Sequence, residues 1–512
     1  MRFVLAIVSF VAAAVLIGTG IAQRTIFAEP DKVTVSTVVS STAPVTVIDG
    51  AALNAFDGTQ TLTVDGPGAV FAAYGRTSDV VAWIGDASYN YVTMDAETGE
   101  LVSTVVRGSE SEVPNPNGSD LWLDDYVKDK TLTMTVNVPN SVSMIIASDG
   151  VEPAPPTIGL SWPLDNSTPW AGPLIVGGAI VLLLGLGFLL WAVHHMRSSR
   201  GPRRKMPKLP KTRVYKTPRA TATKASKTPK GRRRGMIAVP IVLVGALALS
   251  GCSSDFWPAT GTVTAPTPTA TGSIESQLDP PAVTVRQVER IVAKISAVAE
   301  TADADRDAEL LETRFGGAAL ELRLANYTIR GNDPTVGALA AIPAGPVKLT
   351  LPQQTDIWPR AVLAVIQDDK DDTIPPVALV LEQLDARSDY KVMYAITLEP
   401  SAVLPDVAPA SVGAARLLPN SGLLKLTPDD TALAYGGILE QDVESPSYLD
   451  FEAEGDSLRA AVGVAYKKQV QASLPATATA SFSHLLGDAD SISLATNDAG
   501  AIVAVNLYET TT

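Results

Sequence analysis

Three uncharged apolar stretches interrupt the pattern of hydrophobic and polar residues along the chain. They cover residues 3–22, 174–193 and 236–252. The first two have the length that an α-helix needs to cross the hydrocarbon core of a membrane, roughly 20 residues. Trp170 and Trp191 lie at the ends of the second stretch, where aromatic residues favour the membrane interface. We therefore expect transmembrane helices over 3–22 and 174–193, with a cleavable signal peptide as the alternative for the first.

Residues 25–152 show a different pattern, in which apolar and polar residues alternate. In TLTMTVNV (131–138), Leu132, Met134 and Val136 fall on one face and the threonines on the other. Similar patterns occur over 33–39, 61–65, 79–86 and 141–148. Short strands separated by Gly-, Pro- and Asn-rich turns predict an all-β, sandwich-like domain. The Pro-rich residues 153–169 predict a stalk between this domain and the second apolar stretch.

Helical periodicity returns after residue 283. Val288, Val292 and Ile295 share one face of a predicted helix over 284–300, which Thr284 and Gln287 begin as a capping box. A second helical stretch over 305–327 is interrupted by two glycines. Strand-like segments follow at 347–352, 361–367, 377–384 and 390–398. Helices followed by an antiparallel sheet predict an α+β domain over 283–400.

A second α+β unit is expected over 401–512. It combines a predicted helix over 457–474 with a hairpin over 491–509, and it either ends differently from the first unit or is an incomplete repeat of it. The order of elements in the C-terminal region is similar to the cystatin-like and NTF2-like folds. That resemblance implies a sheet that wraps a long helix and offers its apolar concave face to a partner.

Charge is distributed unevenly along the chain. Residues 197–234 contain 16 Lys and Arg and no Asp or Glu, whereas the rest of the chain carries 24 basic and 54 acidic residues. Basic segments beside transmembrane helices stay in the cytoplasm. We therefore expect a multi-pass protein of the cell membrane. Residues 25–170 and 253–512 are extracytoplasmic in this topology, and 194–235 form a basic, disordered cytoplasmic loop.

The third apolar stretch contains the only cysteine of the chain. It follows the basic sequence KGRRRG and ends in Leu249, Ser250, Gly251 and Cys252. This order resembles the lipobox of a bacterial lipoprotein precursor. The resemblance implies cleavage before Cys252 and lipidation of that residue, so that the chain is a lipoprotein precursor fused to a two-helix membrane protein of actinobacterial type. The alternative is a third membrane helix that carries a cysteine by chance. Residues 253–282 are expected to form the flexible linker that follows a lipidated cysteine.

The basic loop is expected to attract the anionic lipids of the bilayer, at about 1 kcal/mol per basic residue near the surface. Its lack of interleaved aromatic residues argues against a nucleic-acid partner. Thr217 and Thr228, each between Lys and Pro, are candidate phosphorylation sites whose added charge would weaken the lipid attraction.

No catalytic motif stands out in the sequence. With one Cys and three His, the chain offers little for nucleophilic or metal chemistry, and we expect no cofactor and no metal site. Serine-hydrolase, phosphate-loop and zinc-protease signatures are missing. Trp83 and Trp122 are expected to pack in the core, with a sugar-stacking platform as the alternative.

The sequence therefore predicts a multi-domain membrane protein with an N-terminal all-β sandwich-like ectodomain, transmembrane helices and a C-terminal α+β ectodomain. We expect a non-enzymatic protein of the cell envelope that binds, scaffolds or assembles, with an envelope protein or glycan as partner. The alternative is an extracytoplasmic enzyme that acts on cell-wall glycan or lipid through carboxylates alone. Such an enzyme needs two acidic side chains roughly 5–10 Å apart in a cleft.

Overall fold

The computed structural model describes residues 2–27, 30–164, 168–198, 279–368, 374–399 and 402–512. The chain divides into two compact units. One contains Met1–Val33 and Leu164–Thr271, and the other contains Thr34–Pro163 and Gly272–Thr512. The predicted loop beyond Ser198, the third apolar stretch at 236–252 and the linker up to residue 278 lie outside the described residues.

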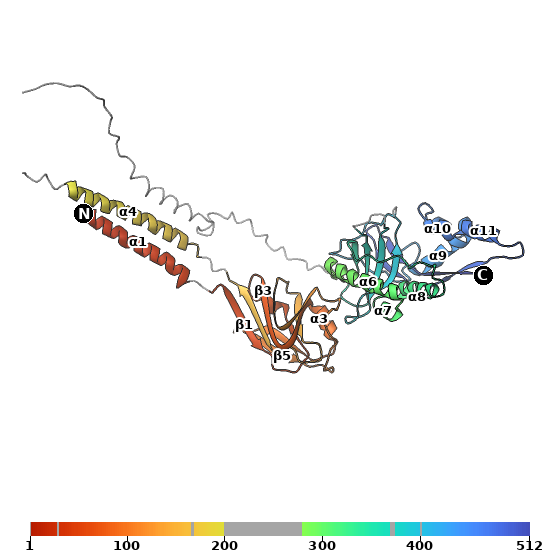
Figure 1. The fold of residues 1–512 in the computed structure, drawn as a ribbon, viewed down its shortest axis with the longest axis horizontal. Helices are drawn as coiled ribbons and strands as arrows, with labels where there is room; N and C mark the ends of the chain where they lie inside the picture. The colour runs from red at the N-terminus through yellow and green to blue at the C-terminus, as the bar shows by residue number, and fades with distance from the viewer. Residues whose placement is uncertain (1, 28–29, 165–167, 199–278, 369–373, 400–401) are drawn as a thin grey trace, which may run out of the picture. The chain divides into compact units, whose positions relative to one another are not determined.

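The first unit contains two antiparallel helices, α1 (Arg2–Thr25) and α4 (Ala171–Ser198), which lie side by side in Figure 1. Their contact is made by small residues at every seventh position. On α1 these are Ala6, Ala13 and Gly20, and on α4 they are Ala171, Gly178, Gly185 and Ala192, all of them buried. A Cβ atom at Gly178 would lie 2.6 Å from Cγ1 of Ile17, so the two backbones approach too closely for a larger residue. A period of seven residues keeps one face of each helix against its neighbour.

Both helices are long and apolar enough to cross a membrane. Phe3–Thr25 has a mean hydropathy of 2.5 over its best window, and Ala171–Ser198 reaches 2.6. Their outward-facing side chains are largely exposed and apolar, as for Leu184 and Leu190. Helices are therefore present at 3–22 and 174–193, and by length and composition both could cross a membrane.

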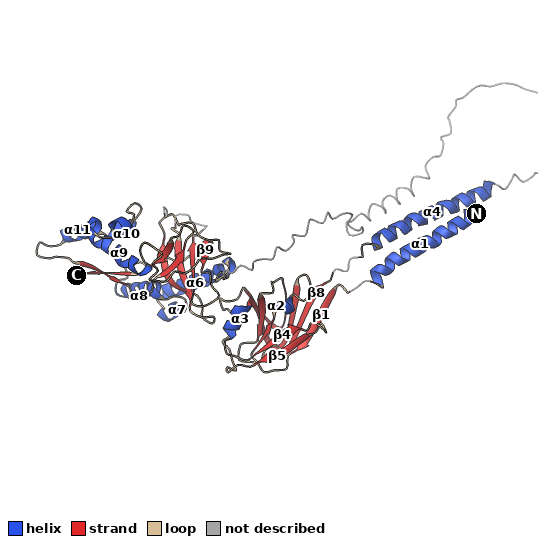
Figure 2. Ribbon diagram, turned by 180° about the vertical axis from the view of Figure 1, so that it is seen from behind, coloured by secondary structure: helices blue, strands red, loops and turns tan. Residues whose placement is uncertain are grey.

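The β-domain (residues 32–163) is built on one eight-stranded sheet. Its strands are β1 (Lys32–Val38), β2 (Val45–Ile48), β3 (Gln60–Arg76), β4 (Tyr89–Met94), β5 (Leu101–Val106), β6 (Asp124–Val136), β7 (Val142–Ala147) and β8 (Thr157–Pro163). The order is β1-β8-β3-β7-β2-β4-β5, with β6 on the other edge of β3. Figure 2 shows β8 beside β1 at one end of this sheet.

The long strand β3 folds the sheet over. Its first half pairs with β8 through Thr61–Asp65, its second half pairs with β7 through Phe71–Arg76, and β6 follows both halves. The register shifts between Asp65 and Ala69, where a bulge bends the strand. The expected sandwich is thus a single curled sheet that approaches a barrel, and β2 and β4 pair in parallel.

Two segments of the β-domain differ from their prediction. Residues 79–84 of the strand expected at 79–86 belong to helix α3 (Thr77–Ile84), because Val80, Trp83 and Ile84 are buried at helical spacing. Residues 157–163, expected within the Pro-rich stalk, form β8, because Ile158, Leu160 and Trp162 alternate inward and complete the sheet. A short helix, α2 (Gly50–Leu53), lies between β2 and β3.

The α+β domain (residues 279–512) begins with three helices and a four-stranded sheet. The helices are α6 (Val285–Asp305), α7 (Ala308–Glu312) and α8 (Gly317–Asn332). The strands β9 (Val347–Pro352), β10 (Arg360–Ile366), β11 (Val377–Gln383) and β12 (Lys391–Thr397) are antiparallel in the order β12-β11-β10-β9. The predicted capping box of α6 is present: Thr284 Oγ1 accepts from the Gln287 amide at 3.3 Å, and Gln287 Oε1 accepts from the Thr284 amide at 3.0 Å. One face of the sheet packs on α6 through a shared hydrophobic core.

The other face of this sheet is covered as well. The hairpin of β14 (Ile492–Ala495) and β15 (Ala501–Ala504) packs there with residues 404–414. All side chains of β10 and β11 are therefore buried. The free apolar face that the cystatin-like resemblance implies is occupied by the chain itself. Residues 401–512 share a core with residues 283–400 and do not form a separate unit.

The remaining elements form a smaller layer around α9 (Pro428–Gln441). They are the short helices η2 (Asp442–Glu444), η3 (Tyr448–Asp450), α10 (Ser457–Val462) and α11 (Val464–Ser473), and the paired strands β13 (Phe482–Leu486) and β16 (Leu507–Thr511). The single helix expected over 457–474 is divided at Gly463, where a Cβ atom would lie 2.3 Å from the Arg459 carbonyl oxygen.

Candidate functional site

The predicted site residues lie outside the part of the chain that the structure describes. This applies to the lipobox residues Leu249, Ser250, Gly251 and Cys252 and to the candidate phosphorylation sites Thr217 and Thr228. Lipidation and phosphorylation therefore stay predictions. Among the described residues, a set of buried ion pairs lies at the interface where the β-domain and the α+β domain meet within one compact unit.

Helix α6 binds one loop of the β-domain with a row of polar side chains. Gln287 Nε2 donates to the Leu121 carbonyl at 2.9 Å, Arg290 donates to the carbonyls of Leu123 at 2.8 Å and Trp122 at 2.6 Å, and Lys294 Nζ donates to the Gly118 carbonyl at 2.7 Å. Residues 287, 290 and 294 share one face of the helix. The helix thus satisfies carbonyl groups of the irregular segment that precedes β6.

Asp120 is the centre of a first buried charge cluster. Its side chain is fully buried, and its carboxylate accepts hydrogen bonds from Arg314, from Lys294 Nζ at 3.0 Å and from the Tyr390 amide at 3.1 Å. Arg314 also pairs with Asp389 at 3.1 Å. A carboxylate from the β-domain is therefore neutralised by cations of the α+β domain.

Asp389, at the rim of this cluster, has a carboxyl group with a raised pKa. Burial raises the pKa of its carboxyl, and the negative charge of Asp120 raises it further, while Arg314 and Lys294 act in the opposite direction. Two carboxylates that share one guanidinium are less favourable than a single buried pair.

Asp79, at the start of α3, is the centre of a second cluster. Arg76 Nε lies 2.9 Å from Asp79 Oδ2, and Arg360 Nη2 lies 2.7 Å from Asp79 Oδ1. Arg76 also donates across the interface to the carbonyls of Pro281 at 3.0 Å and Ala282 at 2.8 Å. The Arg360 side chain is fully buried, and its guanidinium lies 3.7 Å from the ring centre of Trp358. Stacking on an aromatic face suits a weakly hydrated guanidinium.

Arg387 binds the other end of α3. It donates to the last carbonyls of the helix, those of Trp83 at 2.8 Å and Ile84 at 2.7 Å, and it pairs with Glu110 at 3.0 Å. A cation at this end also complements the helix dipole. Gly85 ends α3 with φ at +62°, and a Cβ atom there would lie 3.2 Å from the Arg387 guanidinium. Glycine at this position permits both the turn and the contact.

Apolar side chains join the two domains between these clusters. Trp83 and Trp122 are almost completely buried, with ring centres 5.3 Å apart, in a core that Ala386 and Trp358 of the α+β domain extend. The two tryptophans are core residues, as we expected, and no face is free for a sugar.

Two polar atoms in the interface lack a hydrogen-bond partner among the described residues. They are Nη1 of Arg360 and the hydroxyl of Tyr390. Burial raises the pKa of the Tyr390 hydroxyl, which therefore stays a neutral donor. Buried donors of this kind usually bind an ordered water molecule.

The comparisons with known proteins concern one side of this interface. Residues 279–512 match a family model described as a domain of unknown function, DUF8094. No curated protein and no solved structure shows significant similarity to the chain. The match begins five residues before the Thr284 cap of α6 and spans both layers on the four-stranded sheet, so it covers the whole α+β domain.

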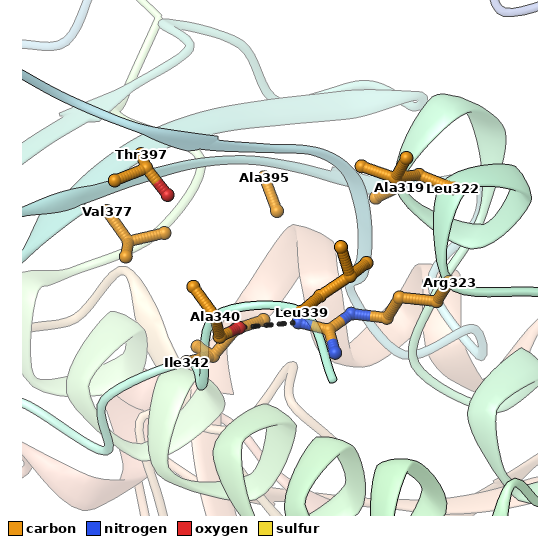
Figure 3. Close-up of a pocket in the computed structure, with 9 residues that line it drawn as sticks. All are labelled: Ala319, Leu322, Arg323, Leu339, Ala340, Ile342, Val377, Ala395 and Thr397. Atoms are coloured by element: carbon orange, nitrogen blue, oxygen red, sulfur yellow. Dashed lines mark hydrogen bonds between the residues drawn. The ribbon is translucent and has the colours of Figure 1, made fainter. Parts of the chain in front are cut away.

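A small cavity lies inside the α+β domain, between α8, residues 339–342 and strands β11 and β12 (Figure 3). Its volume is about 90 Å³, well below the roughly 300 Å³ of a small-molecule site. Arg323 extends along its edge, where it donates to the Ala340 carbonyl at 3.4 Å and pairs with Asp303 on α6. This arginine ties α8 to α6 and to the 339–342 segment.

Carboxylates line a larger groove of the α+β domain. Asp429, Asp488 and Asp490 lie around a volume of about 420 Å³, and Asp429 accepts a hydrogen bond from Ser491 at 2.8 Å. Within the described residues, no group of three His, Cys, Asp or Glu side chains is arranged to hold a metal ion. If the chain is a carboxylate-dependent enzyme, as in the alternative hypothesis, this groove has room for its substrate.

Proposed function

We propose that the chain is a membrane-anchored cell-envelope protein whose two folded domains act together outside the cytoplasm as one binding or assembly module. The domain interface is the observation that carries this proposal. Domains that share buried ion pairs must lie on the same side of a membrane. If α4 crosses the membrane after the β-domain, the chain has to cross back before residue 279.

The apolar residues 236–252 are suited to that return. They follow the basic residues 197–234, which favour the cytoplasmic side. A membrane helix or a lipidated Cys252 both satisfy the requirement, and two acyl chains on that cysteine would anchor the α+β domain stably. The basic segment would then contact the anionic lipids of the inner leaflet.

The packing of α1 against α4 supports retention of the first helix. Small residues at every seventh position of α1 match a similar row on α4. Close approach of this kind stabilises helix pairs in lipid, where apolar burial contributes little. A signal peptide that is removed needs no such match.

Cysteine accessibility tests the topology, because the chain has a single native cysteine. In a Cys252→Ala background, single cysteines replace Ala96, Thr217 or Thr477, and intact cells are treated with a membrane-impermeant maleimide. The proposal predicts labelling at positions 96 and 477, and labelling at 217 only after permeabilisation. Labelling of 217 in intact cells, or protection of 477 together with labelling of 96, would refute it.

The acidic groove of the α+β domain favours one second candidate, an enzyme that hydrolyses cell-wall glycan. In that case the purified chain releases soluble sugar from peptidoglycan, and an Asp429→Asn, Asp488→Asn double variant loses the activity. Equal release by the wild-type chain and the double variant would remove this candidate.

A further inference from the structure

We infer that the β-domain and the α+β domain form a protein–protein complex that does not need the chain between them. Each domain is the binding partner of the other, and the α+β domain recognises a β-domain surface built from α3 and residues 118–123. This inference goes beyond the proposed function and does not depend on which side of the membrane the two domains share.

Charge complementarity identifies the partner. The β-domain contributes the buried carboxylates Asp79 and Asp120, and the α+β domain contributes Arg360, Arg314 and Lys294. Removing such groups from water is costly unless the geometry pairs them closely. A β-domain surface with the same acids in other positions would leave the arginines buried and unpaired, so this arrangement selects its partner.

Backbone recognition runs in both directions. Arg76 of the β-domain donates to the carbonyls of Pro281 and Ala282, while Arg290 and Arg387 of the α+β domain donate to carbonyls of the β-domain. Interfaces with central aromatic and arginine residues and a continuous apolar core are typical of stable complexes. Trp83 and Trp122 supply that apolar centre.

The covalent connection contributes less to this association than a short loop would. Pro163 and Asp279 are separated by more than one hundred residues. The effective concentration that a linker provides falls as the linker lengthens, so a connection of this size adds far less than a short loop. Cleavage anywhere between residues 199 and 278, including cleavage before Cys252, would therefore leave the two domains assembled.

The test cuts the full chain after assembly. A specific protease sequence is inserted after Thr271, and the chain, with different tags at its two ends, is purified in detergent and cut. Residues 272–512 contain none of the three apolar stretches, so a shared micelle cannot retain them. Capture through the N-terminal tag is expected to retain the C-terminal fragment at submicromolar concentration. Release of that fragment from the cut wild-type chain would overturn the inference.

A charge reversal at the interface provides the specific comparison. Asp120→Lys is expected to weaken retention about thirtyfold or more, because it opposes Arg314 and Lys294. Asp57→Lys makes the same charge change at an exposed position of the β-domain and is expected to retain the fragment fully. Equal retention by both variants would mean that the fragments associate elsewhere and would also overturn the inference.

A second variant covers the case in which Asp120→Lys fails to fold. Arg290→Ala with Arg387→Ala removes two half-buried arginines of the α+β domain and leaves no buried carboxylate unpaired. Unchanged circular dichroism with at least a tenfold loss of retention is the expected result. Unchanged retention by this double variant would overturn the inference in the same way.

Discussion

The contact between α1 and α4 and the contact between the β-domain and the α+β domain follow opposite rules. The helix pair is held by glycine and alanine, with close backbone approach. The domain interface is held by arginines, carboxylates and tryptophans, with charges that are fully buried. Both contacts join segments that are far apart in the sequence.

The difference follows from the surroundings in which each contact forms. Apolar side chains gain no free energy by leaving lipid, so only tight packing favours one helix neighbour over another. Water drives the tryptophans of the domain interface together, and the buried ion pairs then fix a single orientation. Substitutions in the two regions should therefore fail for different reasons and by different amounts.

The largest loss is expected from Asp120→Ala. This change leaves Arg314 buried without its main partner, which costs about 3–5 kcal/mol of unfolding free energy. Denaturant unfolding of the purified chain, followed by tryptophan fluorescence, measures it. A double change of Asp120→Leu and Arg314→Met, which removes both charges, should recover much of the loss. A loss below about 1 kcal/mol for Asp120→Ala would mean that water reaches the carboxylate.

A smaller loss is expected from Gly178→Leu in α4. The new side chain would collide with Ile17 of α1, and such overpacking costs about 1–3 kcal/mol. Gly177→Leu is the matched control, because a Cβ atom at that neighbouring glycine meets nothing within 4 Å. Helix separation during titration with dodecyl sulfate measures both. Equal sensitivity of the two variants would contradict the small-residue contact.

The smallest effect is expected from Asp389→Asn, and it depends on pH. Burial and the nearby Asp120 raise the pKa of the Asp389 carboxyl above 3.8. The folded state therefore holds this proton more tightly than the unfolded state, and stability is lost as the pH rises from 3.8 through the raised pKa. The asparagine side chain has no carboxyl to ionise and avoids that loss. The melting temperature of the variant should therefore be about 1–3 °C above that of the wild-type chain at pH 7 and no higher than it near pH 3.5. A gain that is the same at both pH values would contradict this cause.

Much of the fold follows from local patterns in the sequence. The capping box at Thr284 and the helical spacing of Val288, Val292 and Ile295 define α6, and strict alternation defines the last part of β6, from Thr131 to Val136. The four strands of the α+β sheet lie within two residues of their predicted positions. These signals depend on neighbouring residues, so the sequence alone carries them.

The interface has no local signal, and its residues could not be predicted. Asp79 and Asp120 resemble ordinary surface carboxylates until Arg360 and Arg314, about 200 or more positions away, are placed against them. The same limit applies to α3, whose Val- and Trp-rich sequence favours a strand in isolation but whose burial follows a helix. The cover on the second face of the α+β sheet could not be predicted either, because only tertiary packing brings the β14–β15 hairpin there.

Scanning calorimetry of the full chain tests most directly whether the two folded domains form one unit. Our account predicts a single cooperative transition for the β-domain and the α+β domain, and Arg314→Met, although it changes only the α+β domain, should lower that whole transition. Two separate transitions, of which Arg314→Met shifts only one, would contradict it.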